Sequence, residues 1–133
     1  MLFGPEHVQK YVETDGEVGH EWQGTTALIL TTKGRKSGES RSTPLIYGRD
    51  GDNYLIVASL GGAPRHPQWY LNLRDEPEVE LQVKGDHFKA RARTATEEEK
   101  PALWETMVGR WPSYADYQTK TEREIPVVVL ERV

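Results

Sequence analysis

The segment from Glu78 to Arg93 constrains the fold of this chain most strongly. Its sequence, EVELQVKGDHFKARAR, alternates apolar and polar side chains on both sides of the pair Gly85-Asp86. Such alternation is typical of a half-buried β-strand, and a Gly-Asp pair between two such runs predicts a tight hairpin turn. The segment therefore predicts two antiparallel strands. Their apolar positions are Val79, Leu81, Val83, Phe88, Ala90 and Ala92.

Four further runs predict strands. TTALILTT (25–32) is rich in β-branched residues, as buried strands are, and SRSTPLIYGR (40–49) is expected to pair with it. We expect Pro44 at a sheet edge or bulge, because proline cannot donate to a strand ladder. The turn signal Asp50-Gly51 precedes a strand that ends near Ser59, and IPVVVLERV closes the chain as another strand.

Short helices are expected between these strands. The first 22 residues contain one, Pro67 opens a second, and the capping-box pair Thr96 and Glu99 opens a third. No repeat or low-complexity linker divides the chain. We therefore predict a single domain over residues 1–133, an α+β barrel of about six mostly antiparallel strands with short helices.

Composition excludes several classes of protein. The formal net charge of -4 over 133 residues argues against nucleic-acid binding, which normally needs a dominant basic face. The absence of cysteine excludes disulfides and thiol chemistry. No basic start followed by an apolar run and no window of about 18 apolar residues is present, so we expect a cytoplasmic protein without stable membrane insertion. Peripheral contact with a membrane stays open, as does the choice between monomer and homodimer.

The stretch TTKGRKSGESRSTP (31–44) concentrates positive charge in an acidic chain. Glycines and long cations in one turn are suited to an anion such as a phosphate or carboxylate. Their spacing matches neither a Walker P-loop nor a dinucleotide fingerprint. From composition alone, a polar hairpin loop is the favoured interpretation. The residues concerned are Lys33, Gly34, Arg35, Lys36, Gly38 and Arg41.

Residues for independent catalysis are scarce. The four histidines are scattered without the spacing of a metal site, and no nucleophile elbow is visible. If the chain is an enzyme, a bound cofactor is expected to carry the difficult chemistry. Trp111, Tyr114 and Tyr117 straddle a helix break, where they could wall a flat ligand. Ordinary packing explains the spacing of these three aromatic residues slightly better.

Taken together, these stretches resemble the deazaflavin-dependent nitroreductase family. The resemblance runs from about Thr25 to the C-terminus and rests on LILTTKGRKSGESRSTPLIY, DGDNYLIVASLGGAPRHPQWYLNL, PEVELQV and RWPSYADYQTKTEREIPVVVLER. The combination of GRKSG with P-x-W-Y-x-N-L and P-S-Y-x-x-Y is far more specific than any one of its parts. The family fold is a split β-barrel of the FMN-binding type, which agrees with the hairpin-rich pattern.

The resemblance implies coenzyme F420, an 8-hydroxy-5-deazaflavin with a flat tricyclic ring and a phosphate–lactate–oligoglutamate tail. It places the following residues around the coenzyme: Arg35, Lys36, Ser37, Gly38, Arg41, Pro44, Ile46, Ser59, Leu60, Gly61, Trp69 and Asn72. Lys36 and Arg41 correspond to contacts with the tail and its phosphate. The implied acceptor pocket consists of Ile46, Trp111, Tyr114 and Tyr117, and the candidate proton donors are Tyr114, Tyr117 and Ser59.

Three positions depart from the family pattern. Relatives often carry tyrosine where Ile46 stands, lysine where Leu60 stands and, in some cases, tyrosine where Trp111 stands. Coenzyme binding is therefore a firmer expectation than nitroimidazole reduction.

The resemblance implies hydride transfer from the reduced coenzyme to an electron-poor small molecule, such as an enone, a quinone or a nitro compound. Two alternatives remain at this point: an FMN-dependent oxidoreductase of the same fold and a non-catalytic deazaflavin carrier.

Overall fold

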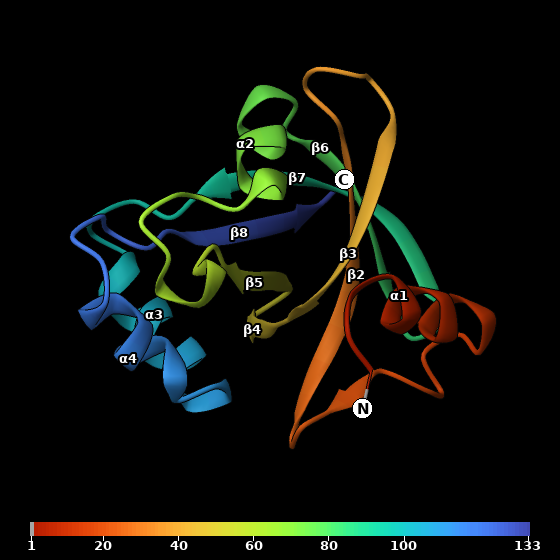
Figure 1. Ribbon diagram of the computed structural model, residues 1–133, viewed down its shortest axis with the longest axis horizontal. Helices are drawn as coiled ribbons and strands as arrows, with labels where there is room; N and C mark the ends of the chain where they lie inside the picture. The colour runs from red at the N-terminus through yellow and green to blue at the C-terminus, as the bar shows by residue number, and fades with distance from the viewer. Residues whose placement is uncertain (1) are drawn as a thin grey trace.

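The structure is a computed structural model that describes residues 2–133, so Met1 of the predicted domain lies outside the described residues (Figure 1). A curled antiparallel sheet forms its centre. The strands are β1 (Glu21–Trp22), β2 (Thr25–Lys33), β3 (Ser40–Ile46), β4 (Gly48–Asp50), β5 (Asn53–Val57), β6 (Glu78–Val83), β7 (Asp86–Thr94) and β8 (Val127–Arg132). The helices are α1 (Gly4–Glu13), the 3-10 turn η1 (Leu60–Gly62), α2 (Gln68–Asp75), α3 (Lys100–Arg110) and α4 (Ser113–Thr119).

The sheet order confirms the predicted α+β split barrel. The strands run β1-β2-β6-β7-β8-β5-β4, and β3 pairs with β2. Over residues 2–133 the sheet has eight strands rather than about six, for two local reasons. The two-residue strand β1 carries no periodic signal, and the run 40–49 divides at Tyr47 into β3 and β4. Pro44 lies opposite Ile29 in the edge strand β3, where its missing N–H costs no ladder bond.

Both predicted two-residue turns lie one position away from the expected one. Val83 pairs with Asp86, so Lys84-Gly85 forms the turn between β6 and β7. In the same way Asp50 pairs with Asn53, which leaves Gly51 and Asp52 in the turn.

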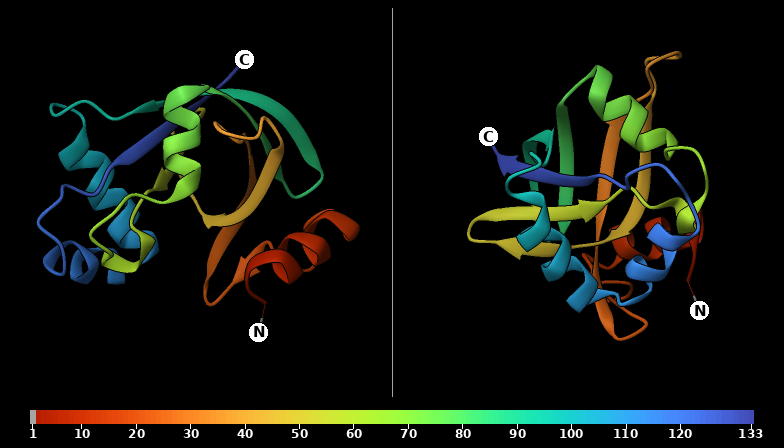
Figure 2. Two further views of the ribbon diagram at one scale, coloured as in Figure 1. Left: turned by 45° about the horizontal axis from the view of Figure 1, so that its top comes forward. Right: turned by 90° about the vertical axis from the view of Figure 1, so that its left-hand side faces the viewer.

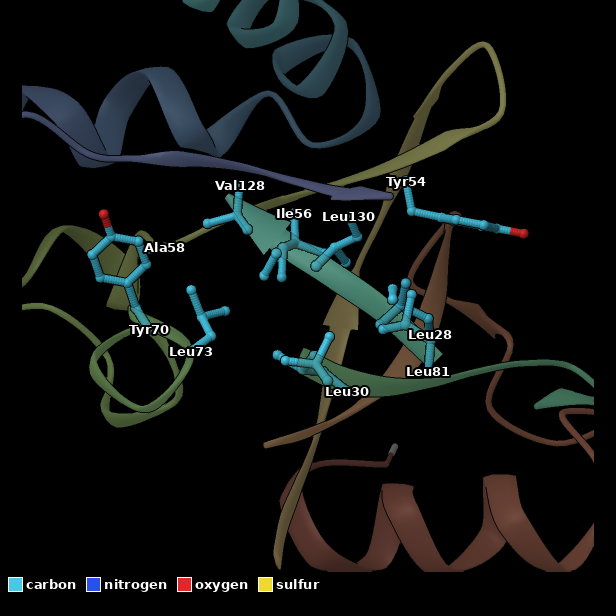
Figure 3. Packing of buried hydrophobic residues seen from close by; sticks show 13 residues of the cluster. Leu28, Leu30, Tyr54, Ile56, Ala58, Tyr70, Leu73, Leu81, Val128 and Leu130 are labelled. Atoms are coloured by element: carbon cyan, nitrogen blue, oxygen red, sulfur yellow. The ribbon is translucent and has the colours of Figure 1, made fainter. Parts of the chain in front are cut away.

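Apolar side chains cover both faces of β5 and β8, which explains why each of these two strands contains a continuous run of hydrophobic residues. On the concave face of the sheet, side chains from five strands and α2 form one buried cluster. Figure 3 shows Leu28, Ile56, Leu73, Leu81 and Leu130 pointing toward one another. On the opposite face of β5 and β8, Leu55 and Val129 pack under Leu103 and Met107 of α3 and Tyr114 of α4. A strand covered on both faces needs apolar side chains at every position.

The helices lie at different places around the sheet, with α1 at the opposite end from α3 and α4 in Figure 1. In Figure 1 the β2–β3 hairpin extends beyond the rest of the sheet, and α2 lies beside its tip. The right-hand view of Figure 2 shows α4 and the chain between β5 and α2 on one side of the sheet. This arrangement brings the hairpin tip, η1 and α4 around one concave region.

Candidate active site

A cavity of about 820 Å³ opens on that side of the barrel. Its walls come from the tip of the β2–β3 hairpin, β3, the loop after β5, the start of α2 and the α3–α4 junction. The N-terminal segment and β1 complete the wall. The volume falls in the usual range for small-molecule and cofactor sites.

Hydrogen bonds shape the basic end of this cavity. The turn 34–39 is closed by the Gly34 N–H donating to the Glu39 carbonyl at 2.8 Å and the Gly38 N–H donating to the Gly34 carbonyl at 2.8 Å. The Arg35 guanidinium donates to Asn72 Oδ1 and to Gln68 Oε1, each at 2.8 Å. Arg35 therefore joins the turn to α2 rather than pointing freely into solvent.

Lys36, Ser37 and Arg41 line the same end of the cavity. The Arg41 side chain is 65% exposed and lies 3.7 Å from the Glu39 carboxylate, a distance at which an exposed pair contributes little. Both long cations can therefore reorient toward an anion at the cavity mouth.

Aromatic side chains form the opposite end. Trp111 Nε1 donates to the Tyr117 hydroxyl at 3.4 Å, and the rings of Tyr114 and Tyr117 meet edge to face at 6.1 Å. Burial, and to a smaller degree the neighbouring Tyr117, raises the pKa of the Tyr114 phenol well above its ordinary value. Tyr114 therefore stays protonated and is a weak acid.

Three wall residues with aromatic rings come from the N-terminal segment, which the sequence did not assign to the site. Trp22 lies 5.8 Å from Trp111 between ring centroids, and Phe3 packs edge to face against Trp22, also at 5.8 Å. His7 stacks on Trp22 at 6.1 Å and donates to the Gly19 carbonyl at 2.8 Å. Their sequence spacing gives no signal of a shared site, because α1 and β1 bring them together only in the fold.

All but one of the predicted site residues line this cavity. Those that do are Arg35, Lys36, Ser37, Arg41, Pro44, Ile46, Ser59, Leu60, Gly61, Trp69, Asn72, Trp111, Tyr114 and Tyr117. Gly38 is absent from the wall. It adopts a positive φ of 73° within the hairpin turn, which its N–H closes by donating to the Gly34 carbonyl. Gly34 of the basic turn lines the wall too, as do residues that the sequence did not single out, among them Thr43, Leu45, Val57, Pro67 and Gln68.

Two further observations bear on the class of protein. Within residues 2–133, no group of three or more His, Asp or Glu side chains is placed to hold a metal ion. No helix of this part of the chain is both long enough and apolar enough to cross a membrane.

A curled antiparallel barrel with a cofactor-sized cavity, basic at one end and aromatic at the other, defines a split-barrel oxidoreductase. Residues 4–132 match the family described as F420H(2)-dependent quinone reductase. The chain is 42% identical over 130 residues to an F420H(2)-dependent quinone reductase of Mycobacterium tuberculosis, a match that covers 95% of this chain and 87% of that protein.

Solved structures agree with these sequence matches. An F420-H2 dependent reductase (FDR-A) superposes with a TM-score of 0.73 at 40% identity, covering 79% of this chain and 93% of the other. A second structure, described as a domain-swapped dimer, superposes with a TM-score of 0.77 at 37% identity over 95% of both chains. The chain belongs to the F420H(2)-dependent quinone reductase family. It is thus an F420-dependent oxidoreductase, and neither FMN as its cofactor nor a carrier role without turnover is supported.

Proposed function

We propose that this protein transfers a hydride from reduced F420 to a quinone, with both molecules held in the 820 Å³ cavity. The observation that carries the proposal is the continuity of this cavity from the basic turn to the aromatic cluster. Family membership supports the coenzyme, and the quinone follows from the activity for which the family and its M. tuberculosis member are named.

The chemistry of the cavity walls fits the coenzyme. The coenzyme tail is polyanionic, and the mobile cations Lys36 and Arg41 at the cavity mouth are suited to bind it. Arg35 is held by Asn72 and Gln68, so it keeps the turn in place and adds a fixed positive charge. Pro44 and Ile46 of β3 offer an apolar wall for a flat ring.

The aromatic end suits a flat electron acceptor. Trp22, Trp111 and Tyr117 present ring faces and edges on which a quinone can stack, and they exclude water from the reacting atoms. Reduced F420 supplies a hydride when bound, so the protein needs mainly to hold two flat molecules together.

The residues that could deliver a proton to the acceptor also line the cavity. The Tyr117 hydroxyl accepts a hydrogen bond from Trp111, which leaves its own proton available to an acceptor oxygen. Tyr114 is a poorer candidate, because its raised pKa makes it a weak acid. Ser59, buried in the cavity wall, remains a third candidate.

Anaerobic turnover with a panel of acceptors tests this proposal. Purified protein with reduced F420 is expected to reduce the bicyclic quinone menadione more efficiently, by kcat/KM, than a cyclic enone or a nitroimidazole. Fluorescence titration with F420 and with FMN provides the binding control. Tight binding of FMN without binding of F420, or turnover of nitro compounds alone, would contradict the proposal.

A further inference from the structure

Arg123 makes an unusual set of contacts for a charged side chain. It lies in the segment between α4 and β8, and all four of its side-chain hydrogen bonds go to neutral acceptors in residues 58–66. Nε donates to the Ala63 carbonyl at 2.9 Å, and Nη2 donates to the Ser59 carbonyl at 2.8 Å. Nη1 donates to the Ala58 carbonyl and to His66 Nδ1, each at 3.2 Å.

No carboxylate balances this charge in the part of the chain that the structure describes. None of the ion pairs formed by residues 2–133 includes Arg123. Its neighbour Glu124 instead pairs with Lys100 at 2.9 Å. Partial burial of an unpaired cation is costly, and it lowers the pKa of Arg123. The donors of the Arg123 guanidinium are therefore directed to the loop at residues 58–66 and not to a carboxylate.

The backbone of Arg123 is itself fixed from α4. Gln118 Nε2 donates to the Arg123 carbonyl at 2.8 Å, and Gln118 Oε1 accepts from the Ile125 N–H at 2.9 Å. The guanidinium is therefore presented to the loop from a rigid support.

The loop that Arg123 holds has a strained backbone. Three consecutive residues have positive φ angles, 45° at Leu60, 63° at Gly61 and 86° at Gly62. A positive φ is energetically unfavourable for leucine, and such strain persists only where surrounding contacts impose it. Ser59, Leu60 and Gly61 all line the cavity.

Peptide geometry then fixes where two donors point. In a trans peptide the C=O and the following N–H point in opposite directions, and residues 2–133 contain no cis peptide bond. Because Arg123 binds the carbonyls of Ala58 and Ser59, the N–H groups of Ser59 and Leu60 point away from the guanidinium. A cation on the carbonyl also polarises the peptide group and strengthens its N–H as a donor.

We infer that Arg123 is a positioning residue for the reductase: it fixes residues 58–63 so that the N–H groups of Ser59 and Leu60 serve as donors to an electron-rich oxygen in the cavity. The inference rests on the proposed function, because that oxygen belongs either to the coenzyme ring or to the quinone. Both are carbonyl oxygens that gain from a preorganised pair of donors.

Backbone amide NMR of the wild-type protein tests the two donors directly. Titration with oxidised F420, followed by menadione, is expected to shift the amide protons of Ser59 and Leu60 downfield. A shift on adding F420 assigns the donors to the coenzyme, and a shift only after menadione assigns them to the quinone. Unchanged amide resonances at saturation with both ligands would overturn the inference.

Two substitutions test the role of Arg123 itself. We expect Arg123→Gln to raise the Kd for F420 or to lower kcat with menadione by at least about tenfold, and Arg123→Lys to recover part of that loss. Arg65→Gln, at an exposed arginine of the same loop, is the matched control and should stay near the wild type. Thermal midpoints of all variants separate loss of function from loss of fold.

These measurements distinguish a failure of the inference on Arg123 from a failure of the proposed function. If the wild type binds F420 and reduces menadione while folded Arg123→Gln keeps both Kd and kcat within about twofold, the inference alone is wrong. If the wild type does neither, the proposed function fails first. If Arg123→Gln does not fold, Arg123→Lys and the amide titration decide the question.

Discussion

Asn72 and Arg35 are joined by two hydrogen bonds across 37 positions of the chain. The Asn72 Oδ1 atom accepts from the Arg35 guanidinium at 2.8 Å and from the Arg35 N–H at 3.3 Å. On its other side, Asn72 Nδ2 donates to Thr32 Oγ1 at 3.3 Å. One buried amide thus attaches the basic turn to both α2 and β2.

Removal of this amide should cost both stability and coenzyme affinity. In Asn72→Ala, the Arg35 guanidinium keeps Gln68 but loses the other of its two partners, and the buried Thr32 hydroxyl loses its donor. We expect a loss of about 1–3 kcal/mol in the free energy of unfolding, measured by urea denaturation, and a weaker Kd for F420. Thr32→Val is the matched variant, because it leaves the Arg35–Asn72 bonds in place. It should lower stability with little change in the Kd, and an equal loss of affinity in both variants would contradict this division.

Lys36 and Arg41 should each contribute to binding of the coenzyme tail. Because both side chains are exposed, we expect each alanine substitution to cost about 1 kcal/mol, roughly fivefold in the Kd for F420. The loss should shrink as salt rises, since salt screens exposed charges. Lys33→Ala, just before the turn and outside the cavity wall, is the control. Fluorescence titration at two salt concentrations measures all three, and unchanged affinity in both Lys36→Ala and Arg41→Ala would refute the anion site.

Two adjacent glycines should respond differently to alanine. At Gly62 a Cβ would lie 2.7 Å from the Tyr117 carbonyl oxygen, whereas at Gly61 it would meet open space. Both have positive φ, which costs an alanine about 1–2 kcal/mol. We expect Gly61→Ala to lose only that amount and Gly62→Ala to lose a further 1–3 kcal/mol or so from overpacking. Urea denaturation of the pair measures the difference, and equal losses would contradict the close approach of Gly62 in η1 to the Tyr117 backbone of α4.

Stability should fall as the pH drops below about 6.5, in part through His20. Burial, followed by the positive charge of Lys84, lowers the pKa of His20 from 6.5, and its Nε2 lies 2.8 Å from the Tyr47 hydroxyl. Between the folded-state pKa and 6.5 the unfolded chain binds more protons than the native protein, so acid favours unfolding. His20→Gln should flatten the slope of the thermal midpoint against pH in this window. Some slope remains, because burial also lowers the pKa of His66; an unchanged slope would exclude His20 as a contributor.

The two tyrosines at the aromatic end should differ in their kinetic effects. Tyr117→Phe removes the hydroxyl best placed to give a proton, so we expect kcat with menadione to fall by about tenfold or more. Tyr114→Phe removes a weak acid and should change kcat little. A larger loss in Tyr114→Phe than in Tyr117→Phe would reverse the assignment of the proton donor.

Local patterns predicted most of the barrel. Alternation in β6 and β7 and apolar runs in β2, β5 and β8 are consequences of which faces the fold covers, so they are visible in the sequence. The exact turn residues were not predictable, because positive φ falls on Lys84 in one turn and on Gly51 in the other. Propensity favours Gly over Lys at such a position, and the register of the strands overrides it.

Some cavity residues could be predicted from the sequence, and others could not. Arg35, Lys36 and Arg41 stand in one turn, so their shared charge was visible without the fold. Phe3 and Trp22 reach the wall only because α1 and β1 fold over the cavity. Arg123 carried no signal, because its partners are mostly backbone carbonyls, which every residue possesses.

Anaerobic stopped-flow mixing of protein-bound reduced F420 with menadione measures hydride transfer in the cavity itself. We expect the absorbance of oxidised F420 to return in a single fast phase, at a rate that exceeds the rate without protein and saturates with menadione concentration. A rate equal to that of the protein-free reaction, or one that shows no dependence on menadione, would contradict hydride transfer within this cavity.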